Sequence, residues 1–413
     1  MAFGIALSGL AAAQTDLDVT ANNISNSETT GFKQSRTEFA ELFSSSLQGV
    51  SSLQPGSGVR VSSIAQQFSQ GNITNTSNSL DLAVNGSGFF AVSNAGALQY
   101  TRSGAFQTDA NGFVVNPAGQ RLQVYPSIGA GTFNTSTFSD LQLQTGQNAP
   151  SATTTAQTSF NLPANAAQPA TAVFDPADST SYNNATSLTV YDSLGAAHTG
   201  TLYFVKTATP NQWNTRLYID GTAVGTGAPP VFTQPLTYSS TGVLTAPAAP
   251  GTISYGTYTP ATGANALNIS FDVSNSTQYG NTFGTTSITQ NGYTTGQLTG
   301  IGVDNTGVVQ ANYTNGQSVA LGKVALVNFA NPQGLQKLDG TNWSETVASG
   351  QPVHGTAGAS GFGQLQSSAL ESSNVDVTSQ LVNMIVAQRN YQSNAQMITT
   401  EKSLMQTVID MAR

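Results

Sequence analysis

The chain has 413 residues, with 12 basic and 20 acidic residues and a formal net charge of −8. Only 8% of it is charged, against about 25% in a typical soluble protein, and no basic stripe is present that could bind the phosphates of a nucleic acid. Without cysteine, disulfides, thiolate catalysis and cysteine zinc sites are excluded, and two histidines cannot build a multi-histidine metal centre.

The first 25 residues predict an amphipathic helix. Its apolar side chains recur at the seven-residue spacing of a coiled-coil stripe, at Phe3, Leu7, Leu10, Leu17 and Ile24. No basic residue precedes Lys33, and the apolar run is shorter than the roughly 20 residues of a bilayer span. We therefore expect neither a conventional signal peptide nor membrane insertion here, and no other segment is apolar enough to cross a membrane.

The next stretch, residues 21–43, reads ANNISNSETTGFKQSRTEFAELF and is too rich in Asn, Ser and Thr to favour a helix interior or a strand. It has too little apolar surface to become ordered alone. We therefore expect an irregular segment that becomes ordered only against other surfaces.

The body of the chain predicts β structure. Residues 80–125 alternate short aromatic or β-branched runs with Gly- and Asn-containing turns. Pro, Ala and Thr become more frequent after Gly146, and the earlier pattern resumes near Thr285, which indicates one β domain inserted into another. The predicted parts are a connector (26–73 and 355–369), a middle β domain (74–145 and 285–354) and an inserted outer β domain (146–284).

The C-terminal segment predicts a second helix, capped by Asn374 or Thr378, with five heptads free of Gly and Pro. Its stripe comprises Val377, Leu381, Met384, Tyr391, Ile398, Met405 and Ile409. Residues 1–25 and 370–413 thus form a helical domain, and the fold class is a multidomain α+β protein, mainly β, whose terminal helices pair as a coiled coil. Either these helices pack only within the chain, or they also bury their remaining stripe in neighbouring copies; the long run of heptads favours the second alternative.

Motifs that could carry chemistry are weak. The turns at Asp109 and Asp304 lack the further carboxylates and the bidentate Glu of a calcium loop, and the glycine-rich residues 355–364 lack the Lys-Ser/Thr of a phosphate loop. We expect His198 on the surface of a hairpin and His354 in a loop. The sequence therefore predicts no enzyme, no catalytic or metal-binding residue and no cofactor.

Several segments resemble one protein family. ANNISNSETTGFK, behind a short helix, resembles the N-terminal motif of bacterial flagellar rod and hook proteins, and NMIVAQRNYQSNAQMITTEKSLMQTVIDM resembles their C-terminal helix. FSQGNITNTSNSLDLAVNGSGFFAV and YTRSGAFQTDANGFVVNPAGQRLQVY resemble their common β region. The resemblance is weaker in the inserted segment. The length and the single insertion are similar to hook members, since rod members are shorter and filament-junction members longer.

The resemblance implies a structural subunit of the flagellar hook, outside the cell, exported through the flagellar channel without a cleaved signal peptide. It implies that many copies self-assemble into a hollow, bendable tube, a universal joint that transmits motor torque to the filament. The paired helices would line the channel and polymerise. The stretch after the first helix would be an extended connector that becomes ordered on assembly, with the family's connector motif at Asn22, Asn23, Thr30, Gly31, Phe32 and Lys33. Implied partners are further copies, the distal rod protein, the hook cap, the hook–filament junction protein and the export apparatus.

Three other interpretations stay open from the residues. The chain could be a rod-type or other axial flagellar component, a secreted β-rich adhesin or glycan-binding module, or a polysaccharide-degrading enzyme. The terminal heptads argue against the last two, because neither needs them.

Overall fold

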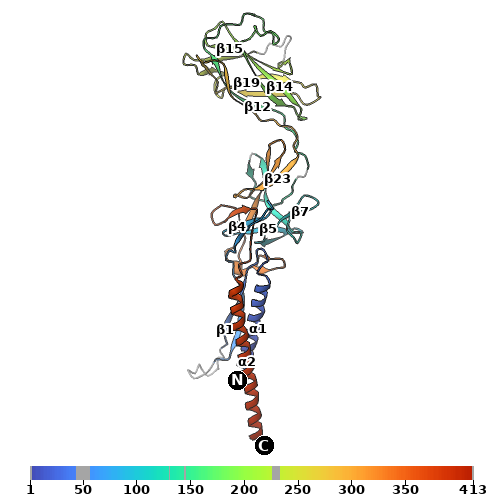
Figure 1. Cartoon of the computed structure of the whole chain (residues 1–413), viewed down its shortest axis with the longest axis vertical. Coiled ribbons are helices and arrows are strands. Elements are labelled where there is room, and N and C mark those ends of the chain that lie inside the picture. Colours follow the sequence, from blue (N-terminus) through green and yellow to red (C-terminus); the bar gives the residue numbers. More distant parts are fainter. Residues whose placement is uncertain (1, 43–55, 130, 144–145, 226–232, 412–413) are drawn as a thin grey trace. The chain divides into compact units, whose positions relative to one another are not determined.

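The computed structural model describes residues 2–42, 56–129, 131–143, 146–225 and 233–411. The chain divides into two compact units, shown in Figure 1. Unit 1 comprises Met1–Thr145, Thr299–Asn312 and Ser318–Arg413, and unit 2 comprises Gly146–Leu298 and Tyr313–Gln317. A mainly β body lies between one long helix near each end of the chain, and the two helices pack together, which confirms the predicted fold class.

The two helices are α1 (Ala2–Ser25) and α2 (Val377–Met411). Good helix formers such as Ala and Leu fill α1, and α2 contains neither Gly nor Pro. The cap of α2 is Asp376, whose carboxylate accepts the Ser379 backbone N–H at 2.9 Å. The prediction of Asn374 or Thr378 as the cap was therefore wrong. The Asn374 side chain instead accepts the Gln34 N–H at 2.8 Å and so links the two terminal segments.

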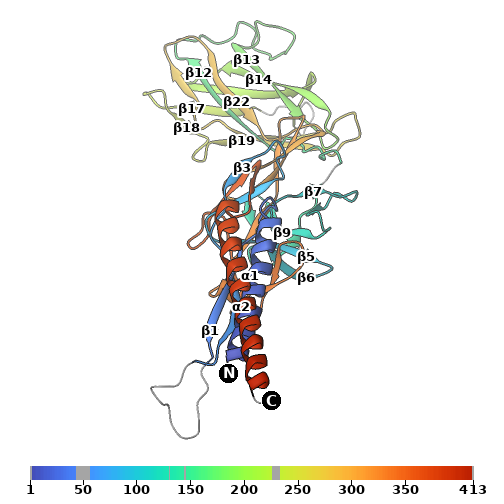
Figure 2. The same cartoon turned by 60° about the horizontal axis from the view of Figure 1, so that its bottom comes forward.

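A β-hairpin lies beside the helices, as Figure 2 shows. Strands β1 (Ser35–Glu41) and β2 (Val59–Gln66) pair antiparallel, and both contact α1. The expectation that residues 21–43 form no strand was therefore wrong for 35–41. Contacts with α1 and within the hairpin stabilise this strand despite its polar composition. Thr37 is buried, and the Val59 N–H donates to the Ser8 hydroxyl at 3.2 Å. Residues 43–55 of the predicted connector lie outside the described residues.

The β part of unit 1 is built around a 13-stranded sheet with the central order β23-β24-β25-β9-β5-β6-β27-β26. Its strands are β5 (Phe89–Asn94), β6 (Ala97–Thr101), β7 (Gln107–Thr108), β8 (Val114–Val115), β9 (Arg121–Gly129), β10 (Thr132–Phe133), β11 (Ser139–Asp140), β23 (Leu298–Val303), β24 (Val308–Tyr313), β25 (Ser318–Asn328), β26 (Gln336–Lys337), β27 (Asn342–Ser344) and β28 (Val353–Thr356). Aliphatic side chains such as Val92, Leu122 and Leu326 form one core cluster. A second, aromatic cluster surrounds Trp343.

Two short strand pairs complete unit 1. They join β3 (Ile73–Asn75) to β30 (Ala369–Glu371), and β4 (Leu82–Asn85) to β29 (Gln364–Ser367). Both pairs bring a segment from before the sheet against the segment that leads into α2. A single 3-10 turn, Pro332–Gly334, lies among the described residues of this unit.

Unit 2 is a β-sandwich. One sheet holds β12 (Thr155–Pro163), β19 (Thr252–Tyr258), β20 (Leu267–Asp272), β21 (Thr277–Tyr279) and β22 (Gly284–Gln290). The other holds β13 (Asn184–Tyr191), β14 (Ala197–Lys206), β15 (Gln212–Ile219), β16 (Thr222–Ala223), β17 (Gln234–Tyr238) and β18 (Leu244–Ala246). Alternate residues of both sheets, among them Phe204, Trp213 and Phe271, enter one shared core.

His198 is buried in unit 2, so its predicted surface position was wrong. The alternation of β14 turns residues 198, 200, 202 and 204 inward. The ring is held between two carboxylates, with Nδ1 2.6 Å from Asp220 Oδ2 and Nε2 3.3 Å from Asp192 Oδ2. Asp192 also accepts the Thr262 hydroxyl at 2.7 Å. His354 lies on β28 rather than in a loop, and its exposed ring packs against Phe138 at 4.9 Å.

Opposing effects set the pKa values of this cluster. Burial alone would lower the pKa of His198, but its hydrogen bonds to Asp220 and Asp192 and their charges raise that pKa overall. Burial alone would raise the pKa of Asp192, but hydrogen bonds from Thr262, Ala196, His198 and Leu194 lower that pKa to about 2. A raised histidine pKa in the folded state stabilises the fold below the unfolded pKa of about 6.5, and this contribution is lost as pH rises through the folded pKa.

We predict that unit 2 loses stability when the pH rises from 6 to 8.5. The urea midpoint should fall when it is followed by Trp213 fluorescence in a Trp343→Phe chain, where the remaining tryptophan is buried in unit 2. His198→Gln cannot titrate and should be less stable at pH 6 with a flatter profile. Equal slopes for the two chains would contradict the prediction.

Candidate functional site

The two terminal helices pack side by side and antiparallel (Figure 1). Gly9 lies against Asn394, because a Cβ on Gly9 would stand 2.6 Å from Asn394 Oδ1. At the other end of the pair, Asn23 Nδ2 donates to Gln380 Oε1 at 3.3 Å. The two residue numbers add up to 403 in both pairs, so one register holds along the whole of α1.

Small and polar residues form the seam between the helices. On α1 the buried residues Ala6, Ala13 and Thr20 recur every seven positions, with Gly9 and Asn23 beside them. On α2 the buried residues are Gln380 and Ala387, and Asn394 continues the same seven-residue line. Small side chains let two helix backbones approach closely. The seam therefore does not use the largest apolar side chains of either helix.

The predicted stripe residues divide between the seam and the outer surface. Leu10, Leu17 and Ile24 are half-buried on α1, and Met384, Tyr391 and Ile398 are half-buried on α2, beside the seam line. The others are exposed, including Leu7 at 51% and Leu381 at 48%. Phe3, Val377, Met405 and Ile409 are exposed in the same way. Half of the predicted stripe residues are therefore exposed, and the other half lie beside the seam.

Sequence reasoning missed the small-residue seam. A signal was present, since Ala6, Ala13 and Thr20 share the heptad period with Gly9 and Asn23. The predicted stripe contains large apolar residues, because these usually occupy the core positions of a coiled coil. The buried residues that face the partner helix lie on a heptad line next to the predicted stripe.

The connector motif is anchored to the body of unit 1. The Asn23 side chain bonds both backbone groups of Ser35, with its Nδ2 2.8 Å from the carbonyl and its Oδ1 2.9 Å from the N–H. Gly31 has φ +69°, and a Cβ there would collide with the backbone of Ser103, so the position requires glycine. Phe32 is buried under the Lys337 ammonium, 4.9 Å from its ring centre. Asn22 is exposed and Thr30 is half-buried.

Lys33 belongs to a buried ionic cluster, which we call the anchor (Lys33, Arg102 and Glu371). Lys33 Nζ lies 2.7 Å from Glu371 Oε1, and both side chains are 0% exposed. Arg102 Nη1 lies 3.3 Å from Glu371 Oε2. Backbone groups complete it, because Glu371 accepts the Gly71 N–H at 2.9 Å and Lys33 donates to the Ser69 carbonyl at 2.7 Å.

The anchor joins three segments far apart in the chain: the motif after α1, the end of β6, and β30, which leads to α2. Burial lowers the pKa of Lys33 and of Arg102, and the charge and hydrogen bonds of Glu371 oppose this in both cases. One carboxylate therefore compensates two buried cations. Each cation would be costly to bury without it.

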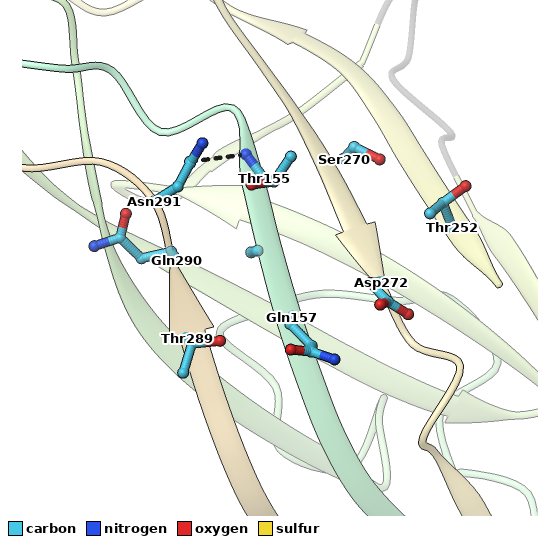
Figure 3. Close-up of a pocket in the computed structure, with 9 residues that line it drawn as sticks. Thr155, Gln157, Thr252, Ser270, Asp272, Thr289, Gln290 and Asn291 are labelled. Atoms are coloured by element: carbon cyan, nitrogen blue, oxygen red, sulfur yellow. Dashed lines mark hydrogen bonds between the residues drawn. The ribbon is translucent and has the colours of Figure 1, made fainter. Parts of the chain in front are cut away.

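Unit 2 contains a hollow of about 410 Å³ lined mainly by polar residues (Figure 3). Neutral side chains of β12, β19, β20 and β22 line it, with Asp272 as its single acid. Glycoside hydrolysis normally requires two carboxyl groups. With Asp272 alone, this hollow does not supply that pair of carboxyl groups. The described residues contain no group of three His, Asp or Glu that could hold a metal ion. None of the described helices is long and apolar enough to span a membrane.

Family models match four parts of the chain. The models are the flagella basal body rod protein (3–33), the flagellar hook protein FlgE/F/G D1 domain (83–168), the flagellar basal body protein FlaE D2 domain (161–293) and the flagellar basal body rod FlgEFG protein C-terminal (366–411). They cover α1 with the connector motif, part of the sheet of unit 1, most of unit 2, and α2. The fold and these matches define a structural protein of the flagellar rod and hook class.

Relatives identify the branch of this class. The chain is 39% identical to the flagellar hook protein FlgE of Salmonella typhimurium over 424 residues, and 39% identical to that of Escherichia coli over 416, covering 100% of both chains in each case. It is 34% identical to the FlgE of Borreliella burgdorferi, covering 98% of this chain and 97% of that one. The chain therefore belongs to the flagellar hook protein family.

A solved structure supports the fold. The Helicobacter pylori flagellar hook protein FlgE2 superposes with a TM-score of 0.53 at 16% identity, and the match covers 72% of this chain and 100% of that one. Hook proteins are structural proteins, and the hook is an extracellular appendage.

We predict that Glu371→Gln destabilises unit 1 by about 3–5 kcal/mol, because it leaves two buried cations without their carboxylate. Urea unfolding followed by Trp343 fluorescence in a Trp213→Phe chain would measure the loss. The matched control is Glu38→Gln, whose partner Arg36 is exposed, so it should cost at most about 1 kcal/mol. Similar losses for the two variants would show that the anchor contributes no more than a surface ion pair.

Proposed function

We propose that this hook subunit assembles through the outward apolar face of its paired terminal helices, giving a hollow, bendable tube that passes motor torque to the filament. One observation carries the proposal: the helices pair through small and polar residues and leave many of their large apolar side chains exposed. Along the paired region these are Phe3 and Leu7 of α1 and Leu381, Val382, Ile385, Val386 and Met397 of α2. Where α2 extends beyond α1, they are Val377, Leu404, Met405, Val408, Ile409 and Met411.

Such exposure is costly for an isolated chain. Fully burying a Leu, Ile, Val or Met side chain contributes roughly 1.5–3 kcal/mol, and a large apolar patch on a protein surface usually marks an interaction site. Repeated along both helices, this contribution could hold a polymer together. The predicted stripes at Phe3, Leu7, Leu10, Leu17 and Ile24, and at Val377, Leu381, Met384, Tyr391, Ile398, Met405 and Ile409, are accordingly our candidate polymerisation residues.

We further infer the arrangement of the parts in the tube. Residues 1–25 and 370–413 would line the channel, and the two β domains would lie outside it. The motif Asn22, Asn23, Thr30, Gly31, Phe32 and Lys33 would connect them and reach its final order on assembly. Distal rod protein, hook cap, hook–filament junction protein and export apparatus are the proposed partners, and no catalytic role or cofactor is proposed.

We predict that Leu7→Asp and Leu381→Asp prevent tube formation while unit 2 and the sheet of unit 1 stay folded. Each places a charge where a neighbouring copy would bury an apolar side chain, at a cost of several kcal/mol per contact. Electron microscopy of concentrated protein would score tubes, and circular dichroism would check the β body. Gln396→Asp adds the same charge at an exposed polar position of α2 and should still assemble.

Curved tubes from the native chain support a hook subunit, whereas straight tubes would favour a rod-type component. If Leu7→Asp and Leu381→Asp both form tubes as readily as Gln396→Asp, the outward face is not the polymerisation surface.

A further inference from the structure

Helix α2 continues past the start of α1 (Figure 1). The constant register pairs residue 401 with Ala2, so residues 402–411 have no α1 residue opposite them in the described chain. We call residues 402–411 the α2 overhang. At 1.5 Å per residue it is about 15 Å long.

The overhang presents an apolar face that continues the seam. Val408 lies on the same heptad line as the buried Ala387, and Met405 on the same line as the half-buried Ile398. In the overhang this face is open, since Met405 is 61% exposed and Val408 60%. Before residue 402, α1 of the same chain covers this face of α2. In the overhang, the same face is still apolar but has no α1 residue against it.

A groove of matching length runs along α1. It is about 380 Å³ in volume and lies where α1 meets the β1–β2 hairpin and α2. Ile5, Ala12 and Asp16 of α1 line it together with Phe39 and Val59 of the hairpin. Ile5 and Asp16 are separated by about 16 Å of helix, close to the length of the overhang. We call this the α1 groove.

The charges of the two surfaces are complementary. Asp16 lies at one end of the α1 groove, and α1 contains no basic residue. Lys402 lies at the start of the overhang, and the other charged residue of the overhang is Asp410, near its end. Neither Asp16 nor Lys402 forms a salt bridge with a described residue.

We infer that the α2 overhang of one copy docks into the α1 groove of a second copy, with Lys402 beside Asp16; this rests on the proposed polymerisation. The contact joins different surfaces of the two copies, so it repeats into an open chain rather than closing as a dimer. Pairing residue 402 with residue 16 shifts the second copy by 15 residues from the register within one chain. That is about 22 Å along the helices.

A charge swap tests the pair with the full chain. Asp16→Lys alone and Lys402→Glu alone should each raise the critical concentration for tube formation about tenfold, because like charges then meet in the interface. An equimolar mixture of the two variants should assemble near the native concentration, since alternating copies restore both pairs. Asp18→Lys, on an exposed line of α1 outside the groove, should leave assembly unchanged.

Cross-linking tests the geometry, because the native chain has no cysteine. Tubes that mix Ala12→Cys chains with Met405→Cys chains should form disulfide dimers on mild oxidation, and each dimer must join two copies. The control is Ala11→Cys, because Ala11 is exposed beside the groove. Mixed with Met405→Cys chains, it should form far fewer disulfide dimers than Ala12→Cys.

If the native chain forms no tubes, the proposed function fails. If it forms tubes, polymerisation stands, and three results would each show that the docking inference is wrong. These are normal assembly of the single charge variants, no rescue in their mixture, or no cross-link between positions 12 and 405.

Discussion

The buried contact between Lys33, Arg102 and Glu371 is the constraint on which the arrangement of unit 1 depends. It fastens the segment after α1 to the sheet, 69 residues further along the chain, and to the strand that leads into α2, 338 residues further along. A chain with so few charges places three of them where water cannot reach. Replacing such a cluster by apolar residues often costs nothing in stability, whereas breaking it is expensive. Its value here is that only one alignment of the three segments satisfies all three charges.

The alignment fixes the points at which α1 ends and α2 starts. Gly31 brings the backbone directly against Ser103, and Asn374 accepts the Gln34 N–H, so α1 and α2 leave the body of unit 1 from adjacent points. Their seam then needs only small side chains and a few amide contacts such as Asn23 to Gln380. The large apolar residues remain available on the outside. A subunit built in this way keeps its helices in register and leaves an apolar surface exposed, which is the surface proposed for assembly.

Periodicity was the most informative part of the sequence. The heptads predicted both terminal helices, and the alternation of strands and turns predicted the β body, because each pattern reports the face that an element buries. The line of residues that faces the partner helix was not predictable in this way, because the residues on it are small or polar and carry no hydrophobic signal. Leu7 and Leu381 fit the heptad and are nevertheless exposed.

Long-range contacts account for the other differences between the predicted and the observed structure. Residues 35–41 look unsuited to a strand until β2 and α1 are packed against them. His198 looks like a surface residue until Asp192 and Asp220 approach from other segments. The Lys33 anchor could not be read from the sequence either, since its partners follow 69 and 338 residues later. A resemblance to flagellar proteins marked Lys33 as notable, but only the fold gives the physical reason.

Hydrogen–deuterium exchange on the monomer and on assembled tubes tests the central claim most directly, because it reports protection segment by segment. Exchange in α1 and α2 should slow by at least about tenfold on assembly, as neighbouring copies cover the outward face, while the core strands β12 to β15 of unit 2 change little. If the helices are equally protected in the monomer and the tube, and assembly protects only unit 2, the account of polymerisation through the helix pair is contradicted.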